Sequence, residues 1–315
     1  MTAQDRERAA AGQHAPAGGP VGREDALDRA VRTLLEAAVA ADRGDARRES
    51  HPMIEAAAAA LRALIASRPG DARCLEQLAI LEHNVGRLNA ARALYGEVNR
   101  LDPPRPPDDR QRRAVDRLAP LVLTTAAECF ALRDCAAIHH PSVPVVAYHF
   151  FWEDDWDYPD DDEPCDHEIA WVRYRPDDGM PVEVTTYFHG RLLTSEPPSP
   201  EARPAVRVQW GTHGTLPAGW ERIAGVEAAL RRGFDASLRG GRVPDHPRKR
   251  RWPPRFPGLW PDYVRFDRAV DSLLPLHREG WIATGRFANA ILHDLFVPYN
   301  FHAKREWPDD GFVNL

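Results

Sequence analysis

Three histidines stand where predicted β-strands meet turns, and two carboxylates flank one of them. The five residues are Asp166, His167 and Glu168 in the segment CDHEI, His189 in YFHG, and His213 in GTHG. A neutral imidazole can bind a metal ion or move a proton near pH 7, and a neighbouring carboxylate can bind the same ion. We therefore predict metal ligands at His167, Glu168 and Asp166, and further ligands or acid–base groups at His189 and His213. The alternative is that each histidine only hydrogen-bonds a backbone carbonyl.

The kind of metal depends on which atoms meet at this place. Histidines with one or two carboxylates suit Zn²⁺ or Fe²⁺, whereas an oxygen-only set suits Ca²⁺ or Mg²⁺. The acidic residues of the preceding loop are Asp154, Asp155, Asp157, Asp160, Asp161, Asp162 and Glu163. The loop lacks the sixth-position glycine and twelfth-position glutamate of an EF-hand. The alternative is that the loop is a solvated run of like charges that repel one another and binds no ion. The identity of the divalent metal ion stays open.

Composition and missing motifs argue against several classes of function. The chain has 315 residues and a net charge of −6, which gives no general attraction to nucleic acid or an anionic membrane. No apolar run approaches the roughly 20 residues of a membrane span. The GxSxG, P-loop and Rossmann patterns do not occur, which argues against serine-hydrolase and nucleotide chemistry. The N-terminus has no secretory apolar region, so we expect a cytoplasmic protein with free cysteine thiols.

The elements that must position these residues differ between the two halves of the chain. Residues 25–100 follow helical periodicity, and a further helix is expected over 108–135. The second half alternates apolar and polar residues over four segments with short connections, which favours antiparallel strands. These segments are 143–152, 168–176, 182–190 and 205–214, with a loop at 191–203 before the last of them. A short helix is expected over 221–233, and two closing helices over 265–280 and 285–300.

One helical segment resembles a tetratricopeptide repeat. The segment 71–103 reads DARCLEQLAILEHNVGRLNAARALYGEVNRLDP, and its matching residues are Leu75, Leu78, Gly86, Ala91, Tyr95 and Pro103. Gly86 permits a tight turn between two helices, and Pro103 ends the second helix. The resemblance implies a protein or peptide partner. The alternative is that the helices only pack against the second half of the chain or against another copy.

The region from Tyr148 to Trp220 resembles a group that joins a vacuolar-protein-sorting family and the necrosis-inducing proteins. The ordered segments YHFFW, EDDWDYPDDDE, DHEIAWV, YFHG and WGTHG carry this resemblance. It implies a β-sandwich with flanking helices and a divalent cation in an acidic pocket. His167 and Trp171 fit the family pattern, but Ala170 and Val172 stand where the family has an aspartate and a glutamate.

Together these patterns predict an α+β protein in three parts. Residues 1–23 form a disordered tail, 24–138 a helical tetratricopeptide-like module, and 139–315 an antiparallel β-sandwich with C-terminal helices. The first functional hypothesis is a metal-binding protein, and more specifically a metal-dependent enzyme acting on a peptide or small metabolite. The second hypothesis is a non-enzymatic adaptor in which both parts bind other proteins. The substrate and the oligomeric state stay open.

Overall fold

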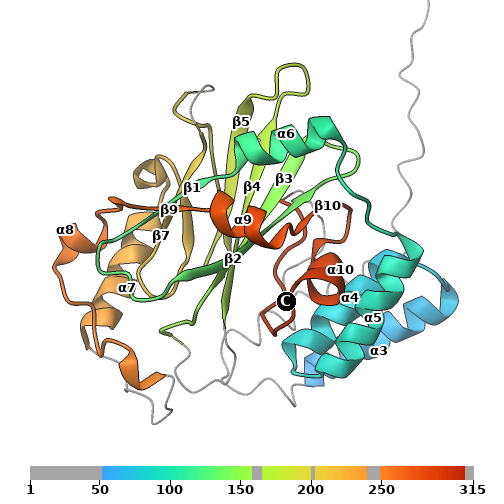
Figure 1. Cartoon of the computed structure of the whole chain (residues 1–315). Helices are drawn as coiled ribbons and strands as arrows, with labels where there is room; N and C mark the ends of the chain where they lie inside the picture. Colours follow the sequence, from blue (N-terminus) through green and yellow to red (C-terminus); the bar gives the residue numbers. More distant parts are fainter. Residues whose placement is uncertain (1–51, 158–164, 200–202, 240–248, 309–315) are drawn as a thin grey trace, which may run out of the picture.

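A computed structural model describes residues 52–157, 165–199, 203–239 and 249–308 (Figure 1). These residues form helices and two mixed sheets, so the chain has the predicted α+β character. The predicted tail and the helical pattern before residue 52 lie outside the described residues, as do Asp160, Asp161, Asp162 and Glu163 of the acidic loop. Within the described ranges, no helix has the length and apolar character needed to cross a bilayer.

Three helices form a layer at one side of the molecule, beside α10 (Ala288–Ile291) (Figure 1). They are α3 (Pro52–Ser67), α4 (Ala72–Asn84) and α5 (Leu88–Leu101). The Asp71 side chain caps α4 by accepting hydrogen bonds from the Arg73 and Cys74 amides. Gly86, between α4 and α5, has a φ of 80°, a left-handed conformation that favours glycine. The helix–turn–helix geometry expected of the segment 71–103 is therefore present.

A six-stranded sheet forms the centre of the molecule. Its strand order is β10 (Ile282–Thr284), β2 (Leu132–His139), β3 (Val145–Trp152), β4 (Asp166–Tyr174), β5 (Pro181–Phe188) and β6 (Arg191–Ser195). The strands from β2 to β6 pair antiparallel, as their short connections require. In β4, Asp166, Glu168, Ala170 and Val172 share one face by alternation, and His167, Ile169 and Trp171 share the other.

A second sheet of four strands packs on one face of the first. Its order is β8 (Thr215–Pro217), β7 (Ala205–Val208), β1 (Leu121–Thr124) and β9 (Arg268–Asp271). Fully buried side chains from both sheets, such as Val122, Val206, Tyr148 and Val172, belong to one apolar cluster. Residues of α6 (Asp109–Leu118) and α9 (Leu273–Glu279) join the same cluster. Burial of this apolar surface holds the two sheets together.

The remaining elements surround the ends of the strands. The helix α7 (Val226–Arg239) and the short helix α8 (Trp260–Tyr263) lie on the opposite side of the sheets from α3, α4 and α5 (Figure 1). They enclose an aromatic cluster that includes Phe188, Trp210 and Tyr263. The other short elements are the 3₁₀ turns η2 (Trp220–Arg222) and η3 (Lys249–Arg251), and the π-helical turn η4 (Leu292–Phe296).

Several predicted elements differ from the structure for identifiable reasons. The helix expected over 108–135 stops at Leu118, because Pro120 follows and a residue before proline avoids the helical region. The strands β1 and β2 come next, so the helical part ends about 20 residues before the predicted boundary at 138. The segment after His189 is strand β6 instead of a loop, and the helix expected over 265–280 contains strand β9.

The sheets are mixed, although antiparallel pairing was predicted throughout. The strand β1 runs parallel to β7, and β10 runs parallel to β2. More than 80 residues separate β1 from β7, and β2 from β10, in the chain. Such long connections remove the constraint that makes neighbouring hairpin strands antiparallel.

Buried rings fill the space between the outer face of the sheet and the helical layer. His149 and His167 stack at a centroid distance of 5.2 Å, and the Phe301 ring lies 4.9 Å from His167. The row continues from Phe301 to His293 at 3.7 Å and from His293 to His83 at 4.2 Å. Burial lowers the pKa of His83 to about 4 and that of His149 to about 3. The row is therefore neutral at pH 7.

This row predicts that acid weakens the attachment of the helical layer. The folded-state pKa of His83 is about 4, whereas its pKa in the unfolded chain is near 6.5. The free energy of unfolding is therefore highest above pH 6.5 and decreases as the pH falls towards 4, because the unfolded chain binds the proton more readily. For His83 alone we expect a loss of about 2 kcal/mol between pH 7 and pH 5. Urea unfolding at both pH values measures this loss. A His83→Phe variant keeps a ring but cannot bind the proton, so its pH dependence should be smaller.

The matched control is His277→Phe, because His277 is an exposed histidine paired with Asp116 outside the row. Hydrogen exchange at pH 5 should show opening of α4 and α5 before the central strands exchange. Equal pH dependence in the wild type and the His83→Phe variant would contradict the prediction.

Candidate functional site

The two histidines predicted to act in acid–base chemistry share an uncommon backbone conformation. Among the described residues, His189 (φ 45°) and His213 (φ 48°) are the only residues other than glycine with positive φ. His189 and Gly190 form the two-residue turn between β5 and β6, in which Phe188 pairs with Arg191. The twist of antiparallel strands favours a turn with positive φ at both positions. The turn therefore places the His189 side chain at the end of the sheet.

His213 is held in a buried network of charges. Its Nδ1 donates a hydrogen bond of 2.8 Å to Oδ2 of Asp166, and its Nε2 lies 3.5 Å from Oε1 of Glu128. The Trp152 ring stacks on the imidazole at a centroid distance of 4.4 Å. Glu128 also accepts hydrogen bonds from the backbone amides of Phe130 and Gly211. The network joins the β1–β2 loop, the start of β4 and the β7–β8 loop.

The charge state of His213 follows from its two carboxylate neighbours. Burial opposes protonation of the imidazole, but Glu128 and Asp166 outweigh it and raise the pKa of His213 to about 10. The pKa of each carboxyl is lowered in return, despite burial, by the imidazolium. His213 is fully buried, so it does not reach a ligand in solvent. In the structure it is a buried positive charge, and its acid–base role stays a prediction.

His167 lies on the opposite face of β4 from Asp166 and Glu168. Its Nδ1 donates to the backbone oxygen of His302 at 2.7 Å, so this nitrogen carries the proton. Its Nε2 then accepts a hydrogen bond of 3.0 Å from Nδ1 of His149. Both ring nitrogens are engaged in hydrogen bonds. On the other face, Glu168 accepts a hydrogen bond of 2.8 Å from the ammonium of Lys304, and burial raises the pKa of Glu168 to about 8.

These contacts do not bring the predicted metal ligands together. Asp166 pairs with His213, Glu168 pairs with Lys304, and His167 bonds other partners across the sheet. Ala170 and Val172 are fully buried in the apolar core between the sheets. In the described part of the chain, no three histidine, cysteine or acidic side chains are grouped to hold a metal ion. The acidic residues 160–163 lie outside the described residues, and the divalent cation stays a prediction.

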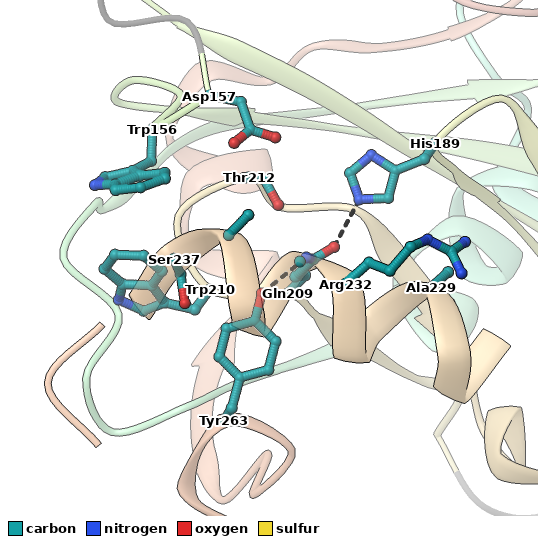
Figure 2. Close-up of a pocket in the computed structure, with 12 residues that line it drawn as sticks. Trp156, Asp157, His189, Gln209, Trp210, Thr212, Ala229, Arg232, Ser237 and Tyr263 are labelled. Carbon is teal, nitrogen blue, oxygen red and sulfur yellow. Dashed lines mark hydrogen bonds between the residues drawn. The ribbon is translucent and has the colours of Figure 1, made fainter. Parts of the chain in front are cut away.

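A cavity of about 300 Å³ lies beside the buried network, and His189 is part of its wall (Figure 2). Its lining comes from the β3–β4 loop, the β5–β6 turn, the β7–β8 loop, α7 and α8. The residues that carry polar groups or aromatic rings are Trp156, Asp157, His189, Gln209, Trp210, Thr212, Arg232, Ser237 and Tyr263. Cavities of this size are at the small end of the range for metabolite sites.

A chain of hydrogen bonds fixes His189 at the cavity wall. Nε2 of His189 donates to Oε1 of Gln209 at 2.6 Å, and Nε2 of Gln209 donates to the Tyr263 hydroxyl at 2.8 Å. Figure 2 shows this chain running from the β5–β6 turn to α8. When the imidazole is neutral, the proton on Nε2 leaves a lone pair on Nδ1. The Tyr263 hydroxyl accepts a hydrogen bond from Gln209, so its own O–H can donate to another group.

Two glycines make room for this arrangement. A Cβ atom at Gly214 would lie 2.9 Å from Nε2 of His189, so only glycine allows the β7–β8 loop to approach the ring. A side chain at Gly233 of α7 would collide with Gln209 and would lie 3.2 Å from the Tyr263 hydroxyl. The close packing limits the space available to the side chains of His189 and Gln209.

Sequence reasoning identified His189 but missed most of the residues around it. Gln209, Thr212 and Tyr263 belong to no recognisable motif. The GTHG turn placed Thr212 beside a predicted site residue, but only the fold shows which of these groups border the cavity. Asp157 was assigned to the acidic run, and Arg232 to a short helix over 221–233. Partial desolvation raises the pKa of the Asp157 carboxyl, the nearby His189 opposes the rise and Asp166 adds to it.

Comparisons with known proteins do not assign this arrangement to a family. No protein-family model, no curated protein and no solved structure matches the chain. The functional conclusion therefore rests on the geometry of the site.

The buried imidazolium predicts an alkaline loss of stability. A raised folded-state pKa gives full stabilisation below the unfolded value near 6.5, which is lost as the pH rises through about 10. Between pH 8 and 9.5 we expect His213 to contribute a loss of about 1.4 kcal/mol per pH unit, in addition to the loss from Glu168, whose pKa is about 8. Replacing Asp166 by Asn lowers the pKa of His213 and should flatten this slope. Urea unfolding across the range measures both slopes, and equal slopes would refute the assignment.

Proposed function

We propose that the chain is an enzyme that binds a small polar metabolite in the cavity and transfers a proton through His189. The observation that carries the proposal is the hydrogen-bond chain from His189 through Gln209 to Tyr263 at the cavity wall. A general base needs a fixed orientation and an accessible lone pair, and this chain supports both. His213, the other histidine predicted from the sequence, supplies a buried positive charge beneath the site.

The lining supports a distinct role for each group. Nδ1 of neutral His189 takes a proton from the bound metabolite or from a water molecule. The imidazolium that results is stabilised electrostatically by the Asp157 carboxylate, which lines the same cavity. The hydroxyls of Tyr263 and Thr212 donate hydrogen bonds to the oxygen atoms on which negative charge develops.

The helical layer supports the site indirectly. Buried residues of α4 and α5, including Leu75 and Tyr95, pack against Phe287 and Ala303 of the C-terminal segment. That segment delivers Lys304 to Glu168 and the His302 carbonyl to His167. The C-terminal segment of the chain thus covers part of the surface of α4 and α5. Recruitment of a protein or peptide partner through this layer stays a prediction, and the adaptor hypothesis stays its alternative.

The first test concerns His189. Replacing it by Gly removes the imidazole but suits the left-handed turn, so stability should stay within about 1 kcal/mol of the wild type. Turnover of a metabolite mixture, followed by NMR, should fall at least about 100-fold. The control variant is His277→Gly on the surface. Turnover that survives in the His189→Gly variant, or no turnover by the wild type, would favour the adaptor.

The second test concerns the orienting chain. A Gln209→Glu variant places a carboxylate beside Nε2 of His189 and favours the imidazolium. The acid limb of the pH profile for kcat/KM should therefore move up by about one pH unit. A Gln209→Leu variant should lose activity without this shift. An unchanged acid limb in the Gln209→Glu variant would mean that Gln209 only fills space.

The metal hypothesis has a separate test that does not depend on turnover. Elemental analysis of the purified protein measures the divalent metal content per chain. A stoichiometric ion that disappears in an Asp166→Asn or His167→Ala variant would support the ligand set predicted from the sequence. An ion retained in both variants would place the metal elsewhere.

A further inference from the structure

The two charged side chains of the cavity stand at different places on its wall. Asp157 lies beside Trp156, and Arg232 lies on the other side of the cavity (Figure 2). Arg232 has no ion pair or hydrogen bond within the described residues. Its neighbour Arg231 differs, because it pairs with Glu227 at 3.8 Å and lies over the Trp260 ring at 3.7 Å. The cavity therefore offers a separated negative charge and positive charge.

One side of the cavity wall is formed by the indole rings of Trp156 and Trp210, whose N–H groups are already used (Figure 2). Nε1 of Trp156 donates to the backbone oxygen of Pro253 at 3.0 Å, and Nε1 of Trp210 donates to that of Ala127 at 2.9 Å. The two ring centroids lie 5.5 Å apart with the planes tilted by 51°. Rings whose donors are satisfied present carbon surface, which suits another ring or a large apolar group.

One buried polar atom in the wall has no partner within the described residues. The Thr212 hydroxyl belongs to a side chain that is 9% exposed, and it makes no hydrogen bond there. Figure 2 shows it among the groups that face the cavity. Leaving a buried hydroxyl unsatisfied is unfavourable, so a bound ligand that hydrogen-bonds to it gains affinity.

We infer that the cavity binds a zwitterion: an α-amino acid, or a similar metabolite, with an aromatic or large apolar side chain. The inference rests on the proposed function and names its substrate class. The ammonium group lies towards Asp157, the carboxylate towards Arg232, and the side chain against Trp156 and Trp210. A dianionic phosphate fits less well, because Asp157 repels it and Arg232 is the cavity's single arginine or lysine among the described residues.

Three small probes separate the charge requirements. L-Phenylalanine carries both charges, 3-phenylpropionate lacks the ammonium group, and 2-phenylethylamine lacks the carboxylate. Titration followed by tryptophan fluorescence reports binding directly, because Trp156 and Trp210 line the cavity. We expect L-phenylalanine to bind the wild type at least about tenfold more tightly than either of the other probes.

Two variants assign each charge to its side chain. Arg232→Gln should weaken L-phenylalanine and 3-phenylpropionate by about tenfold but leave 2-phenylethylamine unchanged. Asp157→Asn should weaken L-phenylalanine and 2-phenylethylamine but not 3-phenylpropionate. Arg231→Gln is the matched control, because Arg231 lies next to Arg232 in α7 outside the cavity lining.

The outcomes separate this inference from the proposed function. Equal affinity for the three probes, or a loss for 2-phenylethylamine in the Arg232→Gln variant, would overturn the zwitterion. If His189-dependent turnover persists in that case, the proposed function stands with another substrate class. If the probes show the expected pattern but turnover does not depend on His189, the cavity is a binding site and the catalytic proposal fails.

Discussion

The buried imidazolium of His213 is the interaction on which the geometry of this site depends. It lies between the carboxylates of Asp166 and Glu128, which come from β4 and the β1–β2 loop. An isolated charge in such a place is strongly unfavourable, so each of the three groups requires the others. The pairing fixes the β7–β8 loop against the end of the central sheet. Gln209 and Thr212, which stand in that loop on either side of Trp210 and Gly211, are thereby fixed at the cavity wall.

Both histidines of the turns adopt a strained backbone conformation. A residue with a Cβ atom in the left-handed region is less favourable than glycine, and histidine tolerates it better than most. At His213 the buried ion pairs compensate for this cost. At His189 the side chain is exposed, and one hydrogen bond to Gln209 offsets the cost of the left-handed conformation. We attribute the strain at His189 to the proposed role of its side chain in the cavity.

The local patterns in the sequence predicted what depends on neighbours along the chain. Alternation located β3, β4 and β5, and the Gly86 turn separated α4 from α5. The same alternation rule could have shown that His167 faces away from Asp166 and Glu168, since adjacent strand residues point to opposite faces. The short strands β1, β9 and β10 could not be found in this way. Each has only three or four residues and exists because a partner distant in the chain pairs with it.

Charge compensation within the described residues involves protein cations, and the divalent cation that the sequence resemblance implied stays a prediction. Buried carboxylates need a positive partner, which a divalent ion or protein cations can supply. Here the partner of Asp166 is the His213 imidazolium, and the partner of Glu168 is the Lys304 ammonium. Lys304 reaches Glu168 from the C-terminal segment that α4 and α5 hold in place. Ala170 and Val172 then require no charge and pack between the sheets. The helical layer, the C-terminal segment and the acidic residues of β4 are thus linked by contacts, and Asp157 and Arg232 of the adjoining cavity belong to neither of these two pairs.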